Sequence, residues 1–539
     1  MAANIADLFE HAADAFGGRT AVCFGEQVIG YAELEERANR LAHFLHDRGV
    51  RPGDHVGLYA GNSIEAVVAM IAVYKLRAAV VNVNFRYVEN ELHFLFADAE
   101  LAALVHDRRF APRVAAVLSA VPGLHTVVAL PDGSDCDLDG YGGVPYENAL
   151  ADGDPGRDFG ERSADDLYLL YTGGTTGYPK GVLWRHEDVW RALGGGVDFM
   201  TGIPLEDEWQ QSRRGAAADA MVRLCLAPLI HGNAQWAALM GLFAGDTVVM
   251  LPHFDADEVW RTIDRRRVNV VVLIGDAMAR PIIEAYATGA YDGSSVFAVN
   301  SSGALFSPVV KRQYLDLLPD ILVTDAVGAS ETGFTGLGVV ADVPGGAVED
   351  PRVMPGPTTV VLDDDNRPVP PGGVGRLAKS GYLPLGYYKD PVKTAALLTE
   401  IDGVRYAFPG DLARLEEDGT ITLLGRGSTC VNTGGEKVFP EEVEGALKTH
   451  PDVFDALVIG VPDERLGQRV AALIQPRPGT RLDLVAIEEH LRQQVAGYKV
   501  PRAVWLVAEI SRTISGKADY RWAHQHATEH PAEEVSHAD

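Results

Sequence analysis

The chain has 539 residues, of which 47% are hydrophobic and 23% charged, and its formal charge at pH 7 is −28. This is a globular composition, and it excludes a disulfide scaffold, a fibrous repeat and extensive disorder. At roughly 150 residues per domain, the length predicts three or four structural units. The acidic balance argues against broad binding to nucleic acid or to an anionic membrane, because such binding depends on cationic surface.

The four cysteines are widely spaced and form no CxxC pair, which predicts free thiols in a reducing compartment and no metal site among them. The N-terminal residues lack the basic and apolar regions of a secretory signal. The longest uninterrupted apolar stretch, Ala66 to Tyr74, is far shorter than the ~20 residues that span a bilayer. The sequence therefore predicts a cytoplasmic protein without a membrane span, and it leaves the oligomeric state open, with a homodimer as one option.

Helical stretches and short apolar runs alternate through the first two thirds of the chain. A helix is predicted over residues 34–45, because apolar side chains recur there at helical spacing and a glycine and the Pro52-Gly53 turn follow. The short runs that follow predict buried strands in an α/β arrangement. These predicted strands are 56–59, 104–105, 126–130, 247–251, 268–274 and 321–324.

The residue composition and the pattern of predicted elements change twice in the last third of the chain. From about Gly356, Pro- and Gly-rich turns separate short strands, which predicts a β-rich part over 356–425. Beyond residue 426, a helix is predicted to open at Pro440, followed by a strand over 454–461 and a helix over 484–494. The predicted fold class is α/β: a large N-terminal domain (1–426) with two α/β layers and the β-rich part, and a small mobile α+β domain (427–523). Residues 524–539 lack apolar periodicity and are predicted to be a disordered tail.

The sharpest motif is the glycine- and threonine-rich string YTGGTTGYPKG, which starts at Tyr171 and ends at Gly181. Its backbone N–H groups, hydroxyls and lysine are suited to surround phosphate oxygens, whereas the alternative is an ordinary Gly-rich surface turn. It is not a Walker A loop, because Gly181 stands where that pattern needs Ser or Thr. The predicted phosphate-binding residues are Thr172, Gly173, Gly174, Thr175, Thr176, Gly177 and Lys180.

This string resembles the signature loop of the adenylate-forming superfamily, which includes acyl-CoA synthetases and usually has YTSGTTGxPKG. Further motifs resemble those of the family in the same order, covering residues 5 to 521. The resemblance implies an enzyme that uses ATP and Mg²⁺ to convert a carboxylic acid into an acyl-adenylate and then transfers the acyl group to CoA. The small domain would rotate between the two steps about a hinge at Ser428.

The nucleotide-binding motifs are assigned through the same resemblance. Residues 324–332 resemble YGxTE, which implies that Glu331, together with Thr176, holds the Mg²⁺ that bridges the ATP phosphates. Asp411 matches the acid that accepts both ribose hydroxyls, and Arg426 the arginine near the ribose and phosphates. Without the resemblance, Glu331 would be read as an ordinary loop acid and Asp411 as a turn-forming acid. Further residues implied to contact ATP or AMP are Ser302, Gly303, Ala304, Asp325, Ala326, Val327, Gly328 and Ser330.

The acyl, CoA and catalytic assignments also follow from the resemblance. His231 lies in a PLxH-like motif and is implied to orient the carboxylate, although a lone histidine among apolar residues is more often a packing residue. Lys517 lies in a PRTxSGK-like motif and is implied to stabilise charge at the α-phosphate during adenylation. The implied wall of the acyl pocket adds Asn233, Gln235 and Trp236, and the implied CoA-binding residues are Gly434, Gly435 and Lys437.

Four positions depart from the commonest family pattern: Gly173, Val327, Pro409 and Ser511. Val327 replaces a tyrosine that stacks on adenine, and the missing aromatic face is predicted to cost about 1 kcal/mol or more in nucleotide binding. Residues 172–188 resemble an actinobacterial branch that includes ligases for bulky carboxylates. The favoured substrate is therefore a polycyclic, steroid- or terpenoid-like acid, followed by medium- or long-chain fatty acids. Two alternatives stay open: an enzyme that loads a carrier protein, and a member degenerate in adenylation.

Overall fold

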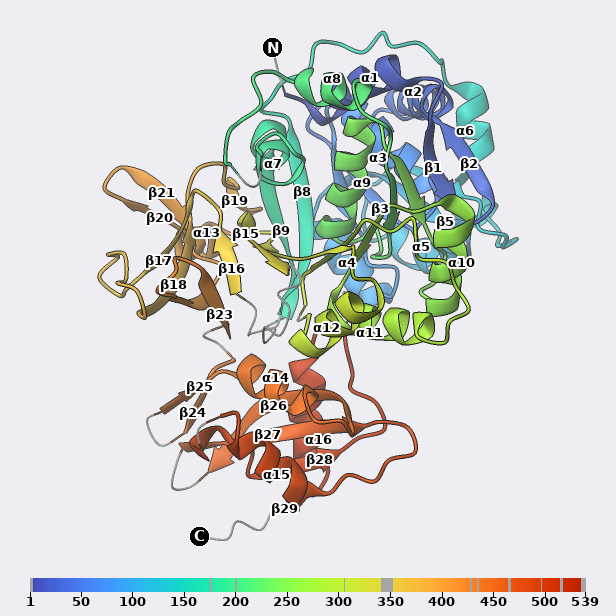
Figure 1. The fold of residues 1–539 in the computed structure, drawn as a ribbon. Coiled ribbons are helices and arrows are strands. Elements are labelled where there is room, and N and C mark those ends of the chain that lie inside the picture. The colour runs from blue at the N-terminus through green and yellow to red at the C-terminus, as the bar shows by residue number, and fades with distance from the viewer. Residues whose placement is uncertain are drawn as a thin grey trace.

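The computed structural model describes residues 3–174, 177–198, 201–304, 306–340, 352–426, 429–433, 436–463, 467–495, 497–513 and 517–534. Within these residues the chain has a large N-terminal domain and a small C-terminal domain, which confirms the predicted fold class (Figure 1). The large domain contains two sheets and the small domain a third.

The first sheet of the N-terminal domain carries the glycine-rich string. Strands β3 and β6 are buried along their whole length, as expected for parallel strands covered on both faces. The two strands at one edge, β9 and β19, run antiparallel to their neighbours. In sheet order, its described strands are β19 (Gly386–Tyr387), β9 (Gly177–Arg185), β8 (Leu167–Gly174), β4 (Ala79–Asn82), β3 (His55–Tyr59), β5 (Leu101–Asp107), β6 (Thr126–Leu130) and β7 (Val144–Pro145).

The second sheet is parallel from β1 to β14 and antiparallel from there on, apart from the antiparallel edge strand β2. Its antiparallel part contains the β-rich region that the turn pattern predicted. In sheet order, its described strands are β2 (Gln27–Gly30), β1 (Thr20–Phe24), β11 (Thr247–Met250), β10 (Val222–Cys225), β12 (Val270–Leu273), β13 (Ala298–Ser302), β14 (Leu322–Ala329), β15 (Gly333–Val340), β16 (Arg352–Pro355), β23 (Ile421–Arg426), β22 (Asp411–Leu415), β18 (Val374–Lys379), β21 (Val404–Ala407) and β20 (Leu398–Ile401), with β17 (Thr359–Leu362) beside β18.

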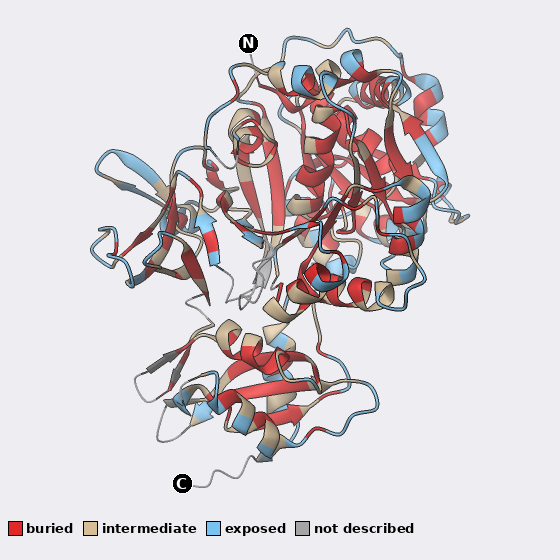
Figure 2. Cartoon of the chain, in the orientation of Figure 1, coloured by how far each residue is buried: buried red, intermediate tan, exposed pale blue. Residues whose placement is uncertain are grey.

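Helices of the N-terminal domain pack between and around these sheets (Figure 2). Every residue of α3 is buried, which explains why its apolar stretch has no polar face, and Ser63 caps it by accepting a hydrogen bond from the Ala66 N–H. No helix among the described residues is both long and apolar enough to cross a membrane. The helices are α1 (Ile5–Phe16), α2 (Tyr31–Asp47), α3 (Ile64–Lys75), α4 (Glu89–Asp98), α5 (Ala111–Leu118), α6 (Tyr146–Asp152), α7 (His186–Leu193), α8 (Gln210–Ala216), α9 (Gly232–Ala244), α10 (Ala256–Arg266), α11 (Gly275–Tyr286), α12 (Pro308–Leu317) and α13 (Pro391–Leu397).

The C-terminal domain is built on the third sheet and has its own apolar core. Helix α14 begins at Pro440, as predicted, because proline suits the first helical position and two glutamates follow it in the first turn. The strands are β24 (Val431–Thr433), β25 (Glu436–Val438), β26 (Val453–Asp463), β27 (Gly467–Pro476), β28 (Ala503–Leu506) and β29 (Glu533–Glu534), and the helices are α14 (Pro440–Lys448), α15 (Leu484–Arg492) and α16 (Tyr520–Glu529).

The end of the chain differs from the prediction of a disordered tail over 524–539. Helix α16 continues to Glu529, and strand β29 pairs with β28. Asp519 caps the helix by accepting a hydrogen bond from the Trp522 N–H, and Ala523 is fully buried. The indole of Trp505 donates to the carbonyl of His530. The contacts with β28 and Trp505 join residues that are distant in the chain, so the local composition of the segment did not reveal them.

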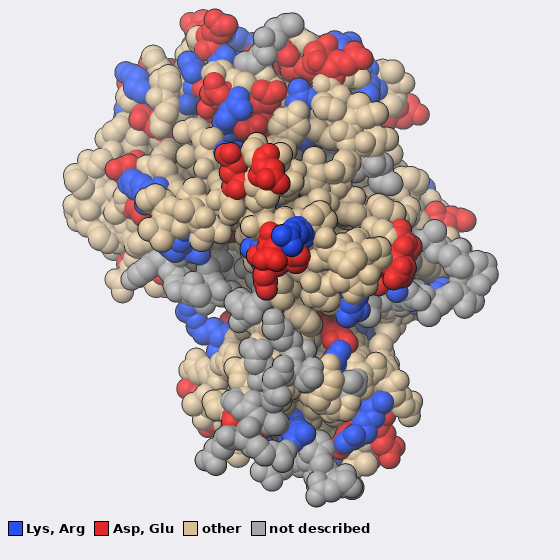
Figure 3. Space-filling view, turned by 90° about the vertical axis from the view of Figure 1, so that its left-hand side faces the viewer, with Lys and Arg blue, Asp and Glu red and all other residues tan. Residues whose placement is uncertain are grey.

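The cysteines and the surface charges agree with the composition of the chain. All four cysteines are free thiols. On the face shown in Figure 3, the described acidic and basic side chains are interspersed rather than gathered into one cationic area. This face therefore offers no broad cationic surface for a polyanionic polymer.

Candidate active site

The glycine-rich string forms a hairpin at the edge of the first sheet. Strands β8 and β9 pair antiparallel, with Thr172 opposite Lys180 and Gly174 opposite Gly177. Thr175 and Thr176, at its turn, lie outside the described residues. The ammonium group of Lys180 lies 5.3 Å from the ring centroid of Tyr387 on the neighbouring strand β19. The described part of the hairpin therefore pairs Gly174 with Gly177 and carries Lys180 on the same hairpin, an arrangement suited to phosphate oxygens.

A buried asparagine that sequence reasoning missed ties this hairpin to the histidine motif. The amide of Asn82, on β4, donates to the carbonyl of Tyr171 at 2.8 Å and to that of Ile230 at 2.6 Å. Its carbonyl oxygen accepts from the Tyr171 N–H at 2.7 Å. Because Ile230 directly precedes His231, one side chain fixes the phosphate strand and the histidine segment relative to each other.

The turn that carries Glu331 is held by two aromatic side chains that the sequence did not single out. The indole of Trp184, on β9, donates to the carbonyl of Ser330 at 3.0 Å. The hydroxyl of Tyr387 donates to Oε1 of Glu331 at 3.0 Å. Since the Tyr387 ring also lies below Lys180, this tyrosine contacts both the acid and the lysine of the predicted phosphate site.

His231 stands at the N-cap position of α9 and makes no side-chain capping hydrogen bond there. Burial lowers its pKa to about 4, and the charge of Lys517 contributes to the lowering. The imidazole is therefore neutral at pH 7. The next residue is glycine because α9 approaches the phosphate strand closely: a Cβ at Gly232 would lie 2.6 Å from a methyl group of Leu170.

The other predicted acyl-pocket residues fall into two groups. Gln235 is satisfied by the scaffold, because it accepts from the Tyr168 hydroxyl and donates to the Leu229 carbonyl, each at 2.8 Å. Trp236 is buried with its ring edge-on to Tyr168. Among the described residues, Nδ2 of Asn233, Nε2 of His231 and Nε1 of Trp236 are buried without a hydrogen-bond partner. These three groups are suited to bind a polar part of a ligand.

The predicted nucleotide residues lie on strand ends of the second sheet. Ser302 ends β13, and Gly303 follows with φ of +78°, a conformation that glycine adopts without steric cost. Asp411 and Arg426 face each other in register on β22 and β23. Ala326, Val327 and Gly328 lie in β14. These predicted residues therefore lie on strands β13, β14, β22 and β23 of one sheet.

Two of the predicted nucleotide-binding residues make contacts that stabilise the fold. Asp325 is buried and pairs with the ammonium of Lys311 on α12 at 2.9 Å. Val327, which stands where the resembling motif has tyrosine, packs its side chain against the core of the β-rich part. No aromatic ring stands at this position, so the weaker adenine contact predicted from the sequence stays an expectation.

Two of the predicted site residues of the C-terminal domain, Lys517 and Lys437, lie in the described part of the chain. Lys517 is exposed, and its carbonyl accepts a hydrogen bond from the Thr513 N–H at 2.8 Å. Lys437 lies in β25 opposite Asn432. Ser428, Gly434 and Gly435 lie outside the described residues. The predicted hinge and CoA loop therefore stay predictions of the sequence.

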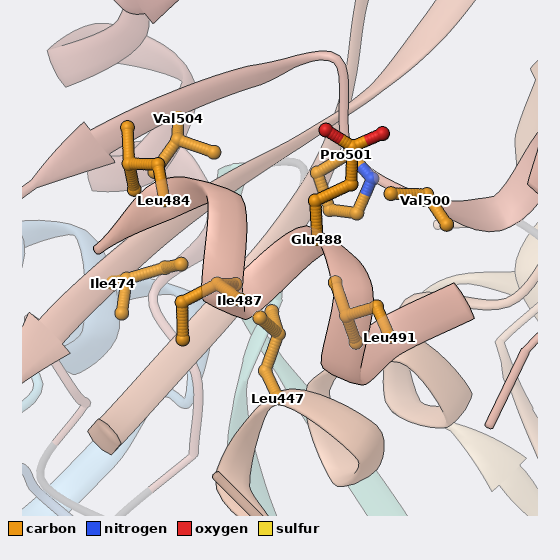
Figure 4. Close-up of a pocket in the computed structure, with 9 residues that line it drawn as sticks. All are labelled: Leu447, Ile474, Leu484, Ile487, Glu488, Leu491, Val500, Pro501 and Val504. Atoms are coloured by element: carbon orange, nitrogen blue, oxygen red, sulfur yellow. The ribbon is translucent and has the colours of Figure 1, made fainter. Parts of the chain in front are cut away.

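An apolar pocket in the C-terminal domain lies apart from these residues (Figure 4). It is lined by core side chains of α14, α15 and the neighbouring strands, such as Leu447, Ile487 and Leu491. Of its lining residues only Glu488 is charged, and its carboxylate pairs with Arg492 at 2.6 Å. This pocket is part of the domain core and offers no group for catalysis.

The hairpin, the carboxylate of Glu331 and Lys517 of the C-terminal domain make up the candidate site, and comparison with known proteins identifies the family of the chain. Residues 9–388 match the AMP-binding enzyme family, and residues 442–517 match the AMP-binding enzyme C-terminal domain. The chain therefore belongs to the AMP-binding enzyme family, which confirms the resemblance found in the sequence.

The relatives and the solved structures agree with this assignment. A 3-oxocholest-4-en-26-oate–CoA ligase of Rhodococcus rhodochrous is 55% identical over 545 residues, covering 99% of this chain and 98% of the relative. A medium/long-chain-fatty-acid–CoA/3-oxocholest-4-en-26-oate–CoA ligase of Mycobacterium tuberculosis is 55% identical over 540 residues, with the same coverage. The crystal structure of the anthranilate CoA ligase AuaEII with anthranoyl-AMP matches with a TM-score of 0.85 at 22% identity over 98% of both chains, which shows the fold alone.

Proposed function

We propose that the protein is an ATP-dependent acyl-CoA ligase whose preferred substrate is a bulky polycyclic carboxylic acid of the steroid side-chain type, with medium- and long-chain fatty acids as secondary substrates. Its enzyme class, an AMP-forming acyl-CoA synthetase, agrees with the ligase names of both relatives at 55% identity. The chemistry is supported by the family matches over residues 9–388 and 442–517, because the second match includes Lys517.

The first half-reaction forms an acyl-adenylate. An oxygen of the substrate carboxylate attacks the α-phosphorus of ATP, the bond from this phosphorus to the bridging oxygen breaks, and pyrophosphate leaves. Lys517 stabilises the charge that develops at the α-phosphate and the carboxylate. Neutral His231 orients the carboxylate without adding charge, and Lys180 and the hairpin backbone hold the phosphates. Asp411 accepts the ribose hydroxyls.

The residues at the Glu331 turn fit a magnesium ion. Mg²⁺ prefers oxygen ligands and is usually bound by one or two carboxylates together with substrate phosphates. Tyr387 holds one oxygen of Glu331, which orients the carboxylate and leaves its second oxygen for a cation. Thr176, the other predicted ligand, lies outside the described residues. Bound Mg²⁺ would neutralise charge on the ATP phosphates.

The second half-reaction transfers the acyl group to CoA. The thiol sulfur attacks the acyl carbon, the carbon–oxygen bond to AMP breaks, and the thiol proton is lost. Lys517 serves only the first step. The C-terminal domain therefore rotates about the predicted hinge at Ser428, so that Lys517 leaves the site and the loop around Gly434 and Gly435 takes its place. CoA as acceptor is favoured by the relatives' names, whereas a carrier-protein acceptor, a homodimer and a cytoplasmic location stay predictions of the sequence.

A panel of acids tests this function. The purified protein is incubated with Mg²⁺, ATP and CoA and with 3-oxocholest-4-en-26-oate, palmitate, octanoate or benzoate, and acyl-CoA and AMP are measured. We expect equal amounts of both products, with the highest kcat/KM for the steroid acid. Product formation only with benzoate would contradict the proposed substrate class. Activity only when a phosphopantetheinylated carrier replaces CoA would show the alternative acceptor.

Replacing Tyr387 by phenylalanine tests the role of the Glu331 turn. The variant loses the hydrogen bond to a charged carboxylate, a contact worth about 1.5 kcal/mol or more. We expect the Mg²⁺ concentration that half-saturates ATP–pyrophosphate exchange to rise about tenfold, because each 1.4 kcal/mol corresponds to a factor of ten. The same shift is expected in calorimetric titrations of the ATP-loaded variant with Mg²⁺, a readout that does not depend on turnover.

The matched control is the neighbouring tyrosine. The hydroxyl of Tyr388 donates to Glu100 at the protein surface, so Tyr388→Phe removes a comparable hydrogen bond away from the site. This control should keep the Mg²⁺ dependence of the parent protein. If Tyr387→Phe and Tyr388→Phe both keep it, Tyr387 does not position Glu331.

A further inference from the structure

Helix α11 lies on the side of the N-terminal domain that faces the C-terminal domain (Figure 1). Asp276, Arg280 and Glu284 are spaced four residues apart, which aligns them on a single helix face. Asp276 is held by the Ser307 N–H, which donates to its Oδ1 at 2.8 Å. Two members of this row, Arg280 and Glu284, contact residues of the small domain.

The central residue of the row is covered by an aromatic ring from the other domain. Arg280 is only 2% exposed, and its guanidinium carbon lies 5.8 Å from the ring centroid of Phe454 on β26. Both terminal nitrogens of Arg280 are buried without a hydrogen-bond partner among the described residues. The face of an aromatic ring stabilises a cation beneath it. Removal of the Phe454 ring would therefore expose the guanidinium group of Arg280 to water.

An ion pair between the domains lies beside this ring. Arg477, just after β27, donates from Nη1 to Oε1 of Glu284 at 3.0 Å, and its guanidinium carbon lies 6.0 Å from the Phe454 ring. The two partners are 193 positions apart in the chain. Both side chains are partly exposed, at 29% and 38%. The contact is therefore one that can open without unfolding either domain.

The covering ring is linked to the segment that carries Lys517. Asp455 follows Phe454 on β26 and pairs with Arg512 at 2.6 Å. Although burial opposes its ionisation, Lys448 and Arg512 lower the pKa of Asp455 to about 2, so the pair is charged at pH 7. Arg512 in turn pairs with Ala518 in an antiparallel bridge, and this hairpin contains Lys517. A short path of contacts thus runs from α11 to the lysine.

We propose that the α11 face formed by Asp276, Arg280 and Glu284 is a docking face that holds the C-terminal domain, through Phe454 and Arg477, in the orientation that serves adenylation. These are positioning residues for Lys517, and the inference rests on the two half-reactions proposed above. Contacts present in only one orientation bias the equilibrium between the two orientations by their own free energy. Weakening the docking face therefore shifts the domain away from the adenylation orientation and leaves the thioester-forming orientation available.

Charge reversal at the ion pair tests this inference. Glu284→Arg and Arg477→Glu each place like charges at the interface, and the double variant restores opposite charges in exchanged positions. We expect each single variant to lower the rate of acid-dependent ATP–pyrophosphate exchange about five- to tenfold, within the usual range of coupling between contacting residues. The double variant should recover most of the loss. Thioester formation from a synthetic acyl-adenylate and CoA should be unchanged or faster in all three.

The matched control is the pair of Arg492 and Glu488, which lies within α15 of the same domain. Arg492→Glu changes the charge of the domain equally and should leave both half-reactions unchanged. Phe454→Ala provides an independent variant with the same expected pattern as the single reversals. Equal loss of both half-reactions, or no recovery in the double variant, would overturn the docking role. If the parent protein shows no pyrophosphate exchange, the proposed function itself fails, which separates the two results.

Discussion

Replacing Lys517 by alanine is expected to lower the rate of adenylation by about 10² to 10³, the usual cost of removing one group that stabilises developing charge. The proposed reason is electrostatic, and the charge of Lys517 also contributes, after burial, to the lowered pKa of His231. The measurement is acid-dependent exchange of labelled pyrophosphate into ATP. Formation of acyl-CoA from a synthetic acyl-adenylate should stay within a few-fold of the parent rate, because that step does not use the lysine.

A matched lysine separates this role from a general effect of charge. Lys499 lies in the same domain, and its ammonium pairs with Glu442 at 2.5 Å. Lys499→Ala removes an equal charge and should keep both half-reactions close to those of the parent protein. If Lys517→Ala lowers both half-reactions equally, the lysine supports the domain rather than the first step, and the proposed division of labour between the two orientations is wrong.

Replacing Lys75 by methionine is expected to destabilise the N-terminal domain by about 3–5 kcal/mol, because removing one partner of a buried ion pair leaves uncompensated charge. The Lys75 side chain is fully buried in α3 and contacts carboxylate oxygens of Glu10 at 2.5 Å and Glu35 at 2.9 Å. Burial alone would raise the pKa of Glu10, but the charges of Lys75 and Arg162 outweigh it and lower the pKa. The variant would leave these carboxylates with less positive charge around them.

Thermal unfolding followed by circular dichroism measures this effect as a lower apparent melting temperature. The control is Lys393→Met, because Lys393 pairs with Asp390 at the surface, where an ion pair is worth at most about 1 kcal/mol. The control should melt close to the parent protein. A Lys75→Met variant as stable as this control would show that the buried cluster does not stabilise the domain.

The parts of the fold that could be predicted from the sequence are those encoded by local patterns. The strand over 126–130 and the start of α14 at Pro440 agree with the prediction, because apolar runs and helix-start residues act over a few positions. The end of α16 was missed because its stabilising contacts come from β28 and Trp505, which are distant in sequence. The order of strands in the three sheets was also beyond a local pattern.

In the candidate site, too, local patterns could be predicted and long-range contacts could not. The motifs that contain Lys180, Glu331 and Lys517 could be found because each is a short string. The residues that connect the motifs could not, because their contacts join separate strings: Asn82 reaches Ile230 across 148 positions, and Trp184 reaches Ser330 across 146. Gln235 lies in a motif, but its hydrogen bonds assign it to the scaffold. Sequence spacing cannot distinguish a residue that faces a ligand from one that supports its neighbour.

The measurement that tests the central claim most directly is ATP–pyrophosphate exchange with 3-oxocholest-4-en-26-oate in the absence of CoA. If the protein forms an acyl-adenylate, labelled pyrophosphate enters ATP only when the acid is present, and addition of CoA converts the system to AMP and acyl-CoA. This outcome would also exclude a member degenerate in adenylation. No exchange with this acid or with a long-chain fatty acid, or formation of ADP and phosphate instead of AMP and pyrophosphate, would contradict it.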